Sequence, residues 1–155
     1  VEEAITFTDL NDYRKMRPRK LSGGLLRRLN IACGIAHKPR LIIMDEPTVA
    51  VDPQSRNKIL EGIQKLNEQG STIIYTSHYM EEVVDADQVF VMDDGRIVMH
   101  GTPREIFSRV DELKKYRMDV PQVTMLADEL IHRGVDLPKG ILRREELVEA
   151  LCRLR

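Results

Sequence analysis

The sequence predicts an α/β fold in which short parallel strands alternate with helices. Two observations carry this prediction: short apolar runs at residues 41–44 and 72–76, and a helical apolar pattern between them. Short continuous apolar runs are typical of strands that are buried on both faces of a layered α/β domain. A strand, a helix and a second strand in this order favour a parallel pair, because the helix provides the crossover.

The chain before the first strand is predicted to contain a loop and then a helix. Residues 1–10 carry the weak pattern of a short helix or a connector, and residues 11–20 are polar and basic, as in a loop. Ser22 stands at the N-cap position of a helical apolar pattern. We expect that helix to end before Pro39, because the residue before a proline disfavours helical geometry.

Beyond the first strand, Pro53 begins a second helical pattern, which Gly70 closes. The second strand is followed by a short helix predicted over residues 79–86. Two further runs, 89–92 and 97–99, flank a turn that contains glycine, as in a hairpin.

The last third of the chain is predicted to be helical. One short helix begins at Pro103 and another at Pro121, and apolar residues from Leu147 onward mark a final helix. We therefore expect a small helical appendage after the hairpin, over about residues 108–155.

Composition limits the class of protein. The chain has 155 residues, of which 42% are hydrophobic, with 24 Lys and Arg against 25 Asp and Glu. This length and balance fit one folded domain of about 100–200 residues and argue against a disordered tail. No apolar run is long enough to cross a membrane and none is typical of a signal peptide. Cys33 and Cys152 lie far apart, which fits a reducing cytosol.

The net charge of 24 − 25 = −1 conceals an uneven distribution. From Arg14 to Arg40 there are nine Lys and Arg residues and no acid, so the remainder carries 15 − 25 = −10. This stretch is either a solvated surface or a region that raises the local potential where phosphates arrive. Arg27 and Arg28 lie one turn into the predicted helix and fit both interpretations. A third interpretation of this stretch is nucleic-acid binding, which the scarcity of aromatic residues disfavours.

The segment Leu21-Ser22-Gly23-Gly24-Leu25 is a candidate phosphate site. Two glycines after a serine at a helix N-terminus expose backbone N–H groups at the positive end of the helix dipole. A glycine-containing cap on an ordinary helix explains the same residues.

Polar side chains follow both predicted parallel strands. Asp45 and Glu46 come directly after the first, and His78 follows the second. The carboxyl ends of parallel strands face the crevice in which α/β proteins bind ligands. An aspartate there is suited to Mg²⁺, and a neighbouring glutamate is suited to polarising water. The alternatives are a solvated turn, an isolated histidine and, for Asp52, a simple helix N-cap.

The order LSGGL, LIIMDEPT, Asp52 and TSH resembles the second half of an ATP-binding cassette (ABC) transporter ATPase. The resemblance covers residues 21–101 almost continuously. It implies a partial P-loop NTPase, or RecA-like, layered fold with parallel core strands, a C-terminal hairpin and a helical appendage. It divides the chain into a connector (1–20), the later part of the ATPase domain (21–107) and a helical extension (108–155).

The resemblance also implies a role for each motif. Ser22, Gly23 and Gly24 form the signature, which contacts the γ-phosphate of ATP bound by an opposite subunit in a head-to-tail dimer. Asp52 is the acid of the D-loop at the dimer interface.

The remaining motif residues would act on the chain's own nucleotide. The resemblance makes Asp45 the ligand of Mg²⁺, Glu46 the catalytic base and His78 the switch histidine. ATP and Mg²⁺ are the implied substrate and ion. The implied partners are a second ATPase subunit and a separate transmembrane permease, with no nucleic acid, at the inner face of the cell membrane.

Two subfamilies are resembled in different places. Residues 21–82 look most like ATPases of multidrug-type (ABC-2) exporters, and residues 101–155 look like energy-coupling-factor transporter ATPases. Leu25 stands where many members have Gln. The D-loop Val49-Ala50-Val51-Asp52 is bulkier than usual, which predicts weaker packing between subunits.

No G-x-x-x-x-G-K-[ST] phosphate loop occurs in the sequence. Without that loop the β- and γ-phosphates lose their main electrostatic partners, so we expect this chain alone to have negligible ATPase activity. The alternative function is a non-catalytic regulatory or interaction module derived from an ABC ATPase.

Overall fold

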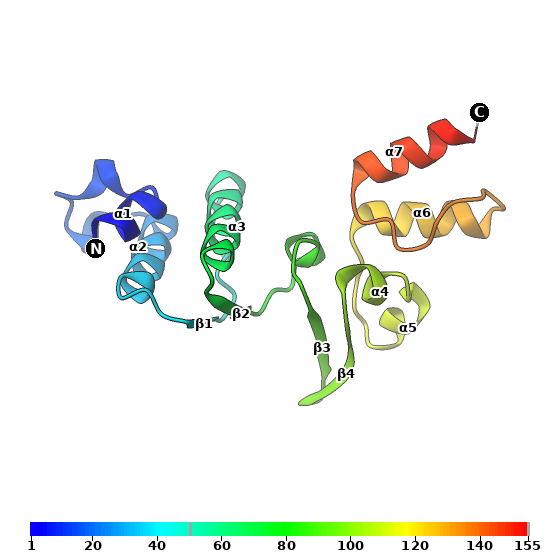
Figure 1. Cartoon of the computed structure of the whole chain (residues 1–155), viewed down its shortest axis with the longest axis horizontal. Helices are drawn as coiled ribbons and strands as arrows, with labels where there is room; N and C mark the ends of the chain where they lie inside the picture. Colours follow the sequence, from blue (N-terminus) through cyan, green and yellow to red (C-terminus); the bar gives the residue numbers. More distant parts are fainter. Residues whose placement is uncertain (50, 155) are drawn as a thin grey trace. The chain divides into compact units, whose positions relative to one another are not determined.

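The computed structural model describes residues 1–49 and 51–154, and the chain forms two compact units. Unit 1 comprises Val1–His78 and unit 2 comprises Tyr79–Arg155 (Figure 1). All the residues predicted to carry chemistry belong to unit 1.

Unit 1 contains a β-α-β arrangement preceded by two helices. Strands β1 and β2 pair in parallel, with Leu41 opposite Thr72 and Met44 opposite Tyr75, so the predicted parallel pair is confirmed. The helices and strands of this unit are α1 (Glu2–Phe7), α2 (Gly23–Ile35), β1 (Leu41–Met44), α3 (Pro53–Glu68) and β2 (Thr72–Tyr75), with 3-10 turns at Asn11–Tyr13 and Pro18–Lys20.

The predicted cap at Ser22 is confirmed, and Asp52 forms the helix cap that the sequence offered as its alternative role. The Ser22 hydroxyl accepts a hydrogen bond from the Leu25 N–H at 3.3 Å, where α2 begins. Asp52 Oδ1 accepts from the Ser55 N–H at 2.9 Å, where α3 begins. Each cap satisfies an N–H group that the first turn of a helix leaves without an internal partner.

The core of unit 1 lies between the strand pair and its helices. Figure 1 shows α2 and α3 on the same side of β1 and β2, and α1 packs against α2. Ala32 and Ile35 of α2 and Ile59 of α3 are buried there with Ile42 of β1. Apolar burial on this one side is the main force that holds the strand pair in place.

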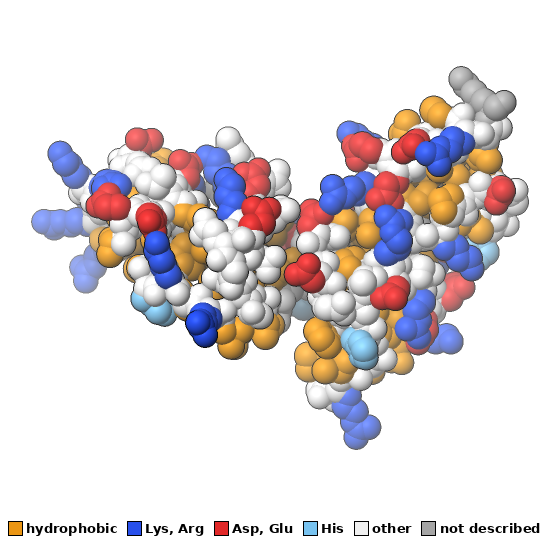
Figure 2. Space-filling model, viewed as in Figure 1, with side chains coloured by type: hydrophobic (Ala, Val, Ile, Leu, Met, Phe, Trp, Pro, Cys, Tyr) orange, Lys and Arg blue, Asp and Glu red, His pale blue; other side chains and the backbone are white. Residues whose placement is uncertain are grey.

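The prediction that both strands are buried on both faces is wrong. Residues whose side chains point away from the helices are open to solvent: Ile43 is 72% exposed, and Leu41 and Ile74 are also exposed. Hydrophobic side chains lie uncovered on the lower side of this unit (Figure 2). The reason is that, among the described residues of unit 1, the helices cover one face only.

Unit 2 consists of a hairpin and short helices. Strands β3 and β4 pair antiparallel, as predicted, and a register shift lies between Val91 and Met92. Residues 79–86 contain a 3-10 turn rather than an α-helix, and the helix α5 had no separate signal in the sequence. The elements are the 3-10 turn (Met80–Val83), β3 (Val89–Asp93), β4 (Arg96–Gly101), α4 (Pro103–Phe107), α5 (Val110–Lys115), α6 (Gln122–His132) and α7 (Arg144–Arg153).

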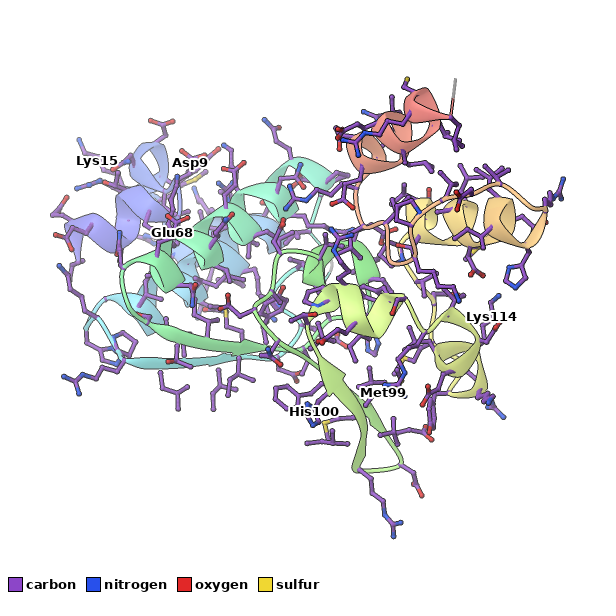
Figure 3. The ribbon with its side chains drawn as sticks, turned by 45° about the vertical axis from the view of Figure 1, so that its right-hand side comes forward. Asp9, Lys15, Glu68, Met99, His100 and Lys114 are labelled. Carbon is purple, nitrogen blue, oxygen red and sulfur yellow. The ribbon has the colours of Figure 1, made fainter. Side chains whose placement is uncertain are left out.

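Two apolar clusters hold unit 2 together. One lies between the hairpin and α4 and α5 and includes Met99, which Figure 3 labels, and Phe107. The other joins α6 to α7 through Ala127 and Leu147. In the described parts of both units, no helix is long and apolar enough to cross a membrane.

A close backbone approach joins α4 to the segment before α7. The Arg104 guanidinium donates to the carbonyl oxygen of Gly140 at 2.8 Å and pairs with Glu146 at 3.0 Å. Gly140 has a φ of 73°, and a Cβ atom there would lie 2.9 Å from the Arg104 carbonyl oxygen. A side chain at this position therefore meets both backbone strain and a collision.

We predict that Gly140→Ala lowers the free energy of unfolding by more than about 1 kcal/mol, measured by urea titration. Gly95→Ala is the matched control, because Gly95 has the same φ of 73° but open space around the added Cβ. The control isolates the collision from the backbone strain. Equal losses in the two variants would show that the approach to Arg104 contributes nothing.

Candidate functional site

Asp45 and Glu46 are held at the carboxyl end of β1 by a hydroxyl from the end of β2. Thr76 Oγ1 donates to Asp45 Oδ1 at 2.7 Å and accepts from the Glu46 N–H at 2.9 Å. One side chain therefore joins the two strand ends and orients one carboxylate. The predicted meeting of polar groups at this edge of the parallel pair is what the structure shows.

His78 lies against the second carboxylate. Its Nε2 is 2.6 Å from Glu46 Oε1, and the imidazole is 83% exposed while the Glu46 side chain is 34% exposed. With an ionised carboxylate, a proton on Nε2 makes this contact a hydrogen bond. Asp45, Glu46 and His78 therefore meet at one edge, as the sequence predicted; Asp45 and His78 are exposed and Glu46 is half-buried.

The backbone that presents Glu46 is in a left-handed conformation, with a φ of 44°. Few residues other than glycine adopt this geometry, and it persists only where the surroundings hold it. Pro47 and Thr48, which follow, are almost completely buried. The turn is therefore anchored by the two residues after Glu46, whose own side chain is only half-buried.

Arg27 holds this turn from α2. Its Nη2 donates to the carbonyl oxygens of Asp45 at 2.5 Å and Glu46 at 2.6 Å, and its Nε donates to that of Pro47 at 3.3 Å. A guanidinium carries five donors in a rigid fork, which suits it to bind several acceptors at once. The sequence places Arg27 one turn into the predicted helix but does not predict that its guanidinium binds the turn at residues 45–47.

The predicted signature residues lie at the N-terminus of α2, close to the N-terminus of α3. Gly23 has open space around it, whereas a Cβ atom on Gly24 would lie 3.7 Å from Val51 and 3.8 Å from Asp52 Oδ2. The structure therefore brings Gly24 of the signature next to Asp52, and Ser22 caps the same helix. Ala50 of the predicted D-loop lies outside the described residues.

The charge of Asp52 is stabilised in the folded protein. Hydrogen bonds from the Ser55 side chain and backbone N–H hold the pKa of the Asp52 carboxyl below its usual value of 3.8. The helix N-terminus that it caps favours the same ionised state.

The donor set is suited to a magnesium ion that arrives with a nucleotide. The described part of the chain contains no group of three or more His, Cys, Asp or Glu side chains that could hold a metal. Mg²⁺ is commonly bound by one or two carboxylates together with substrate phosphates and water, so Asp45 with one neighbour fits that mode.

Comparison with known proteins shows what the chain is similar to. A family model described as ABC transporter matches residues 1–49. The chain is 50% identical, over 99% of its length, to the energy-coupling factor transporter ATP-binding protein EcfA1 of Caldanaerobacter subterraneus. Over the full length of this chain, it is also 49% identical to the protein of that name from Clostridium novyi. The chain is therefore similar to ATP-binding proteins of ABC transporters over its whole length.

Solved ABC cassettes share the fold. The chain matches cbiO1 from Clostridium perfringens, described as part of the ABC transporter complex cbiONQ, with a TM-score of 0.63 and 28% identity over 85% of this chain and 51% of that chain. It matches a dimeric cassette bound to ADP and Pi with a TM-score of 0.61 and 28% identity, over 65% of this chain and 44% of that one. The predicted ABC ATPase fold is confirmed.

The chain spans about half the length of the curated relatives it matches, covering 56% of each of the two EcfA1 proteins. The likeness to energy-coupling-factor ATPases runs along the whole chain, including residues 21–82, where a likeness to exporter ATPases was expected.

We predict that Arg27→Met lowers the free energy of unfolding by about 1–3 kcal/mol, because it removes charged hydrogen bonds to three carbonyl groups of one turn. Urea titration measures the change. Arg19→Met is the control, since Arg19 is exposed and receives no assigned contact in the described structure. A loss no larger than that of the control would contradict the role given to Arg27.

We predict that Asp52→Asn reduces the loss of stability in acid. Because the folded pKa of Asp52 is below its ordinary value, unfolding takes up a proton, so the contribution of the charged cap is complete above about pH 4 and is lost as the pH falls toward the folded pKa. Asparagine can keep the cap without titrating.

Urea titrations between about pH 6 and pH 3 test this prediction. Ser55→Ala removes the largest cause of the lowered pKa and should give a pH dependence between those of the wild type and Asp52→Asn. Identical pH profiles for all three proteins would refute the assignment.

Proposed function

We propose that this chain supplies the water-activating and dimer-closing parts of an ATP-binding transporter subunit that couples ATP hydrolysis to translocation of a substrate. The observation that carries the proposal is the contact between Glu46 and His78, beside Asp45, at the carboxyl end of a parallel strand pair. The curated relatives, which are ATP-binding proteins of energy-coupling factor transporters, support the same function. We also propose the functional division 1–20, 21–107 and 108–155.

Asp45 would provide a carboxylate oxygen to the Mg²⁺ that accompanies ATP. The Thr76 hydroxyl donates to Asp45 Oδ1, which leaves the other carboxylate oxygen free to bind the ion or its water. Bound Mg²⁺ supplies charge neutralisation for the phosphate groups.

Glu46 would act as the general base. Its half-buried side chain is still in reach of water, and a carboxylate there can accept a proton from water that attacks the γ-phosphate. His78 would hold that carboxylate in one orientation and contact the same phosphate. Thr76 and Arg27 fix the backbone of Glu46, so the base is positioned before the substrate arrives.

Ser22, Gly23 and Gly24 would act on a nucleotide bound by a second ATPase subunit. The open surroundings of Gly23 leave room for a phosphate at the N-terminus of α2. Asp52 would lie at the same interface, since it adjoins Gly24. One solved relative is described as dimeric and bound to ADP and Pi, which supports this arrangement.

The membrane partner would be a separate permease, and the chain would lie in the cytoplasm at the inner face of the cell membrane.

A chimera tests the function. The part of the Caldanaerobacter subterraneus relative that this chain does not match would be joined ahead of Val1, to provide a phosphate loop. We predict that the chimera hydrolyses ATP, that the 155-residue chain alone does not, and that Glu46→Gln lowers the turnover of the chimera about 100-fold or more.

Glu61→Gln is the matched control, because it makes the same chemical change at an exposed glutamate on α3. If both variants retained turnover, Glu46 would not be the base. A chimera that binds ATP but never hydrolyses it would favour the regulatory module instead.

A further inference from the structure

A short basic segment of unit 1 precedes the signature, and none of its residues is among those assigned above to the nucleotide site. Five of the seven residues from Arg14 to Lys20 are Lys or Arg, and the segment contains no acid. All seven residues are exposed. Lys and Arg side chains project from the end of unit 1 that holds α1 (Figure 2), and Figure 3 shows Lys15 at the margin of that unit.

Four of these cations are not neutralised by the fold. Arg14 is occupied, because it pairs with Glu2 and donates to Asn11 Oδ1 at 2.8 Å. Within residues 1–49 and 51–154, no hydrogen bond or ion pair of a side chain is assigned to the other four, which are Lys15, Arg17, Arg19 and Lys20. Outside the segment the chain carries 19 − 25 = −6, so the positive charge is local.

The segment is held on the folded unit rather than hanging free. Leu10 is buried and Tyr13 packs against the same apolar cluster. Residues 14–17 lie between two 3-10 turns, Asn11–Tyr13 and Pro18–Lys20. The four cations therefore form a surface of fixed location, which we call the basic edge.

We propose that the basic edge binds anionic phospholipid headgroups. The proposal rests on the proposed function, which brings the chain to the inner face of a membrane. Clustered Lys and Arg residues are attracted to anionic lipid over a distance of about one Debye length. Met16, in the middle of the segment, is 46% exposed and presents an apolar side chain that can enter the headgroup layer.

Nucleic acid fits the basic edge less well. The segment has no aromatic side chain on which a base can stack, and Tyr13 beside it is partly buried in the core. Its only regular structure is a three-residue 3-10 turn, which does not provide a helix or ribbon that could enter a groove.

Vesicle sedimentation with the 155-residue chain tests the proposal. The probes are vesicles of phosphatidylcholine alone and vesicles with increasing phosphatidylglycerol. We expect binding only with the anionic lipid and weaker binding at high salt. Replacing Lys15, Arg17, Arg19 and Lys20 together by Gln should weaken binding at least about a hundredfold, since each charge contributes roughly fivefold.

The matched control removes the same four charges from unit 2. Lys114, which Figure 3 labels, Lys115, Arg117 and Lys139 are all exposed and would be replaced together by Gln. This control should bind vesicles almost as the wild type does. Circular dichroism would establish that both variants are folded.

Three results would overturn the proposal: equal weakening in the two variants, equal binding to neutral and anionic vesicles, or tighter binding to a single-stranded RNA oligonucleotide than to anionic vesicles. Vesicle binding requires no ATP turnover. The proposal can therefore fail while the Glu46 prediction succeeds, and the reverse also holds.

Discussion

The candidate site depends on the Thr76 hydroxyl, which bonds to both acidic residues from the neighbouring strand end. The hydroxyl donates to the Asp45 carboxylate and accepts from the Glu46 backbone, and these two bonds join the ends of β1 and β2. A parallel pair of four-residue strands has little stability of its own. A side-chain bond across the end of this pair therefore helps to fix the positions of Asp45 and Glu46 relative to each other. His78 follows Thr76 by two residues, so the same end of β2 also places the imidazole beside Glu46.

The second constraint comes from α2, which serves both predicted parts of the site. At its N-terminus are the signature glycines, and one turn later Arg27 reaches the turn that carries Asp45 and Glu46. A displacement of α2 would therefore move the signature and the turn together. This arrangement gives a physical route by which contact at the signature can affect the geometry of the catalytic base.

Much of this arrangement could be predicted from local signals. The sequence predicts the N-cap at Ser22 and offers one at Asp52, because capping depends on residues within one turn of each other. The polar edge at Asp45, Glu46 and His78 followed from the rule that parallel strands end together. The bonds of Arg27 and Thr76 could not be predicted in this way. They join residues some twenty to thirty positions apart, so they depend on the strand register and the placement of α2, which periodicity does not provide.

The wrong prediction of strand burial has the same origin and bears on how the site is stabilised. A run such as Leu41–Met44 is apolar at every position, so its sequence shows no difference between a covered and an open face. In unit 1, Ile42 is buried against the helices while Ile43 is open, so the strands gain apolar burial on one side only. With half of the usual burial, hydrogen bonds directed at the backbone account for a larger share of what holds the turn at Glu46. The left-handed conformation of that residue therefore depends on Arg27 and Thr76, and a change to either should alter the orientation of the base before it unfolds the unit.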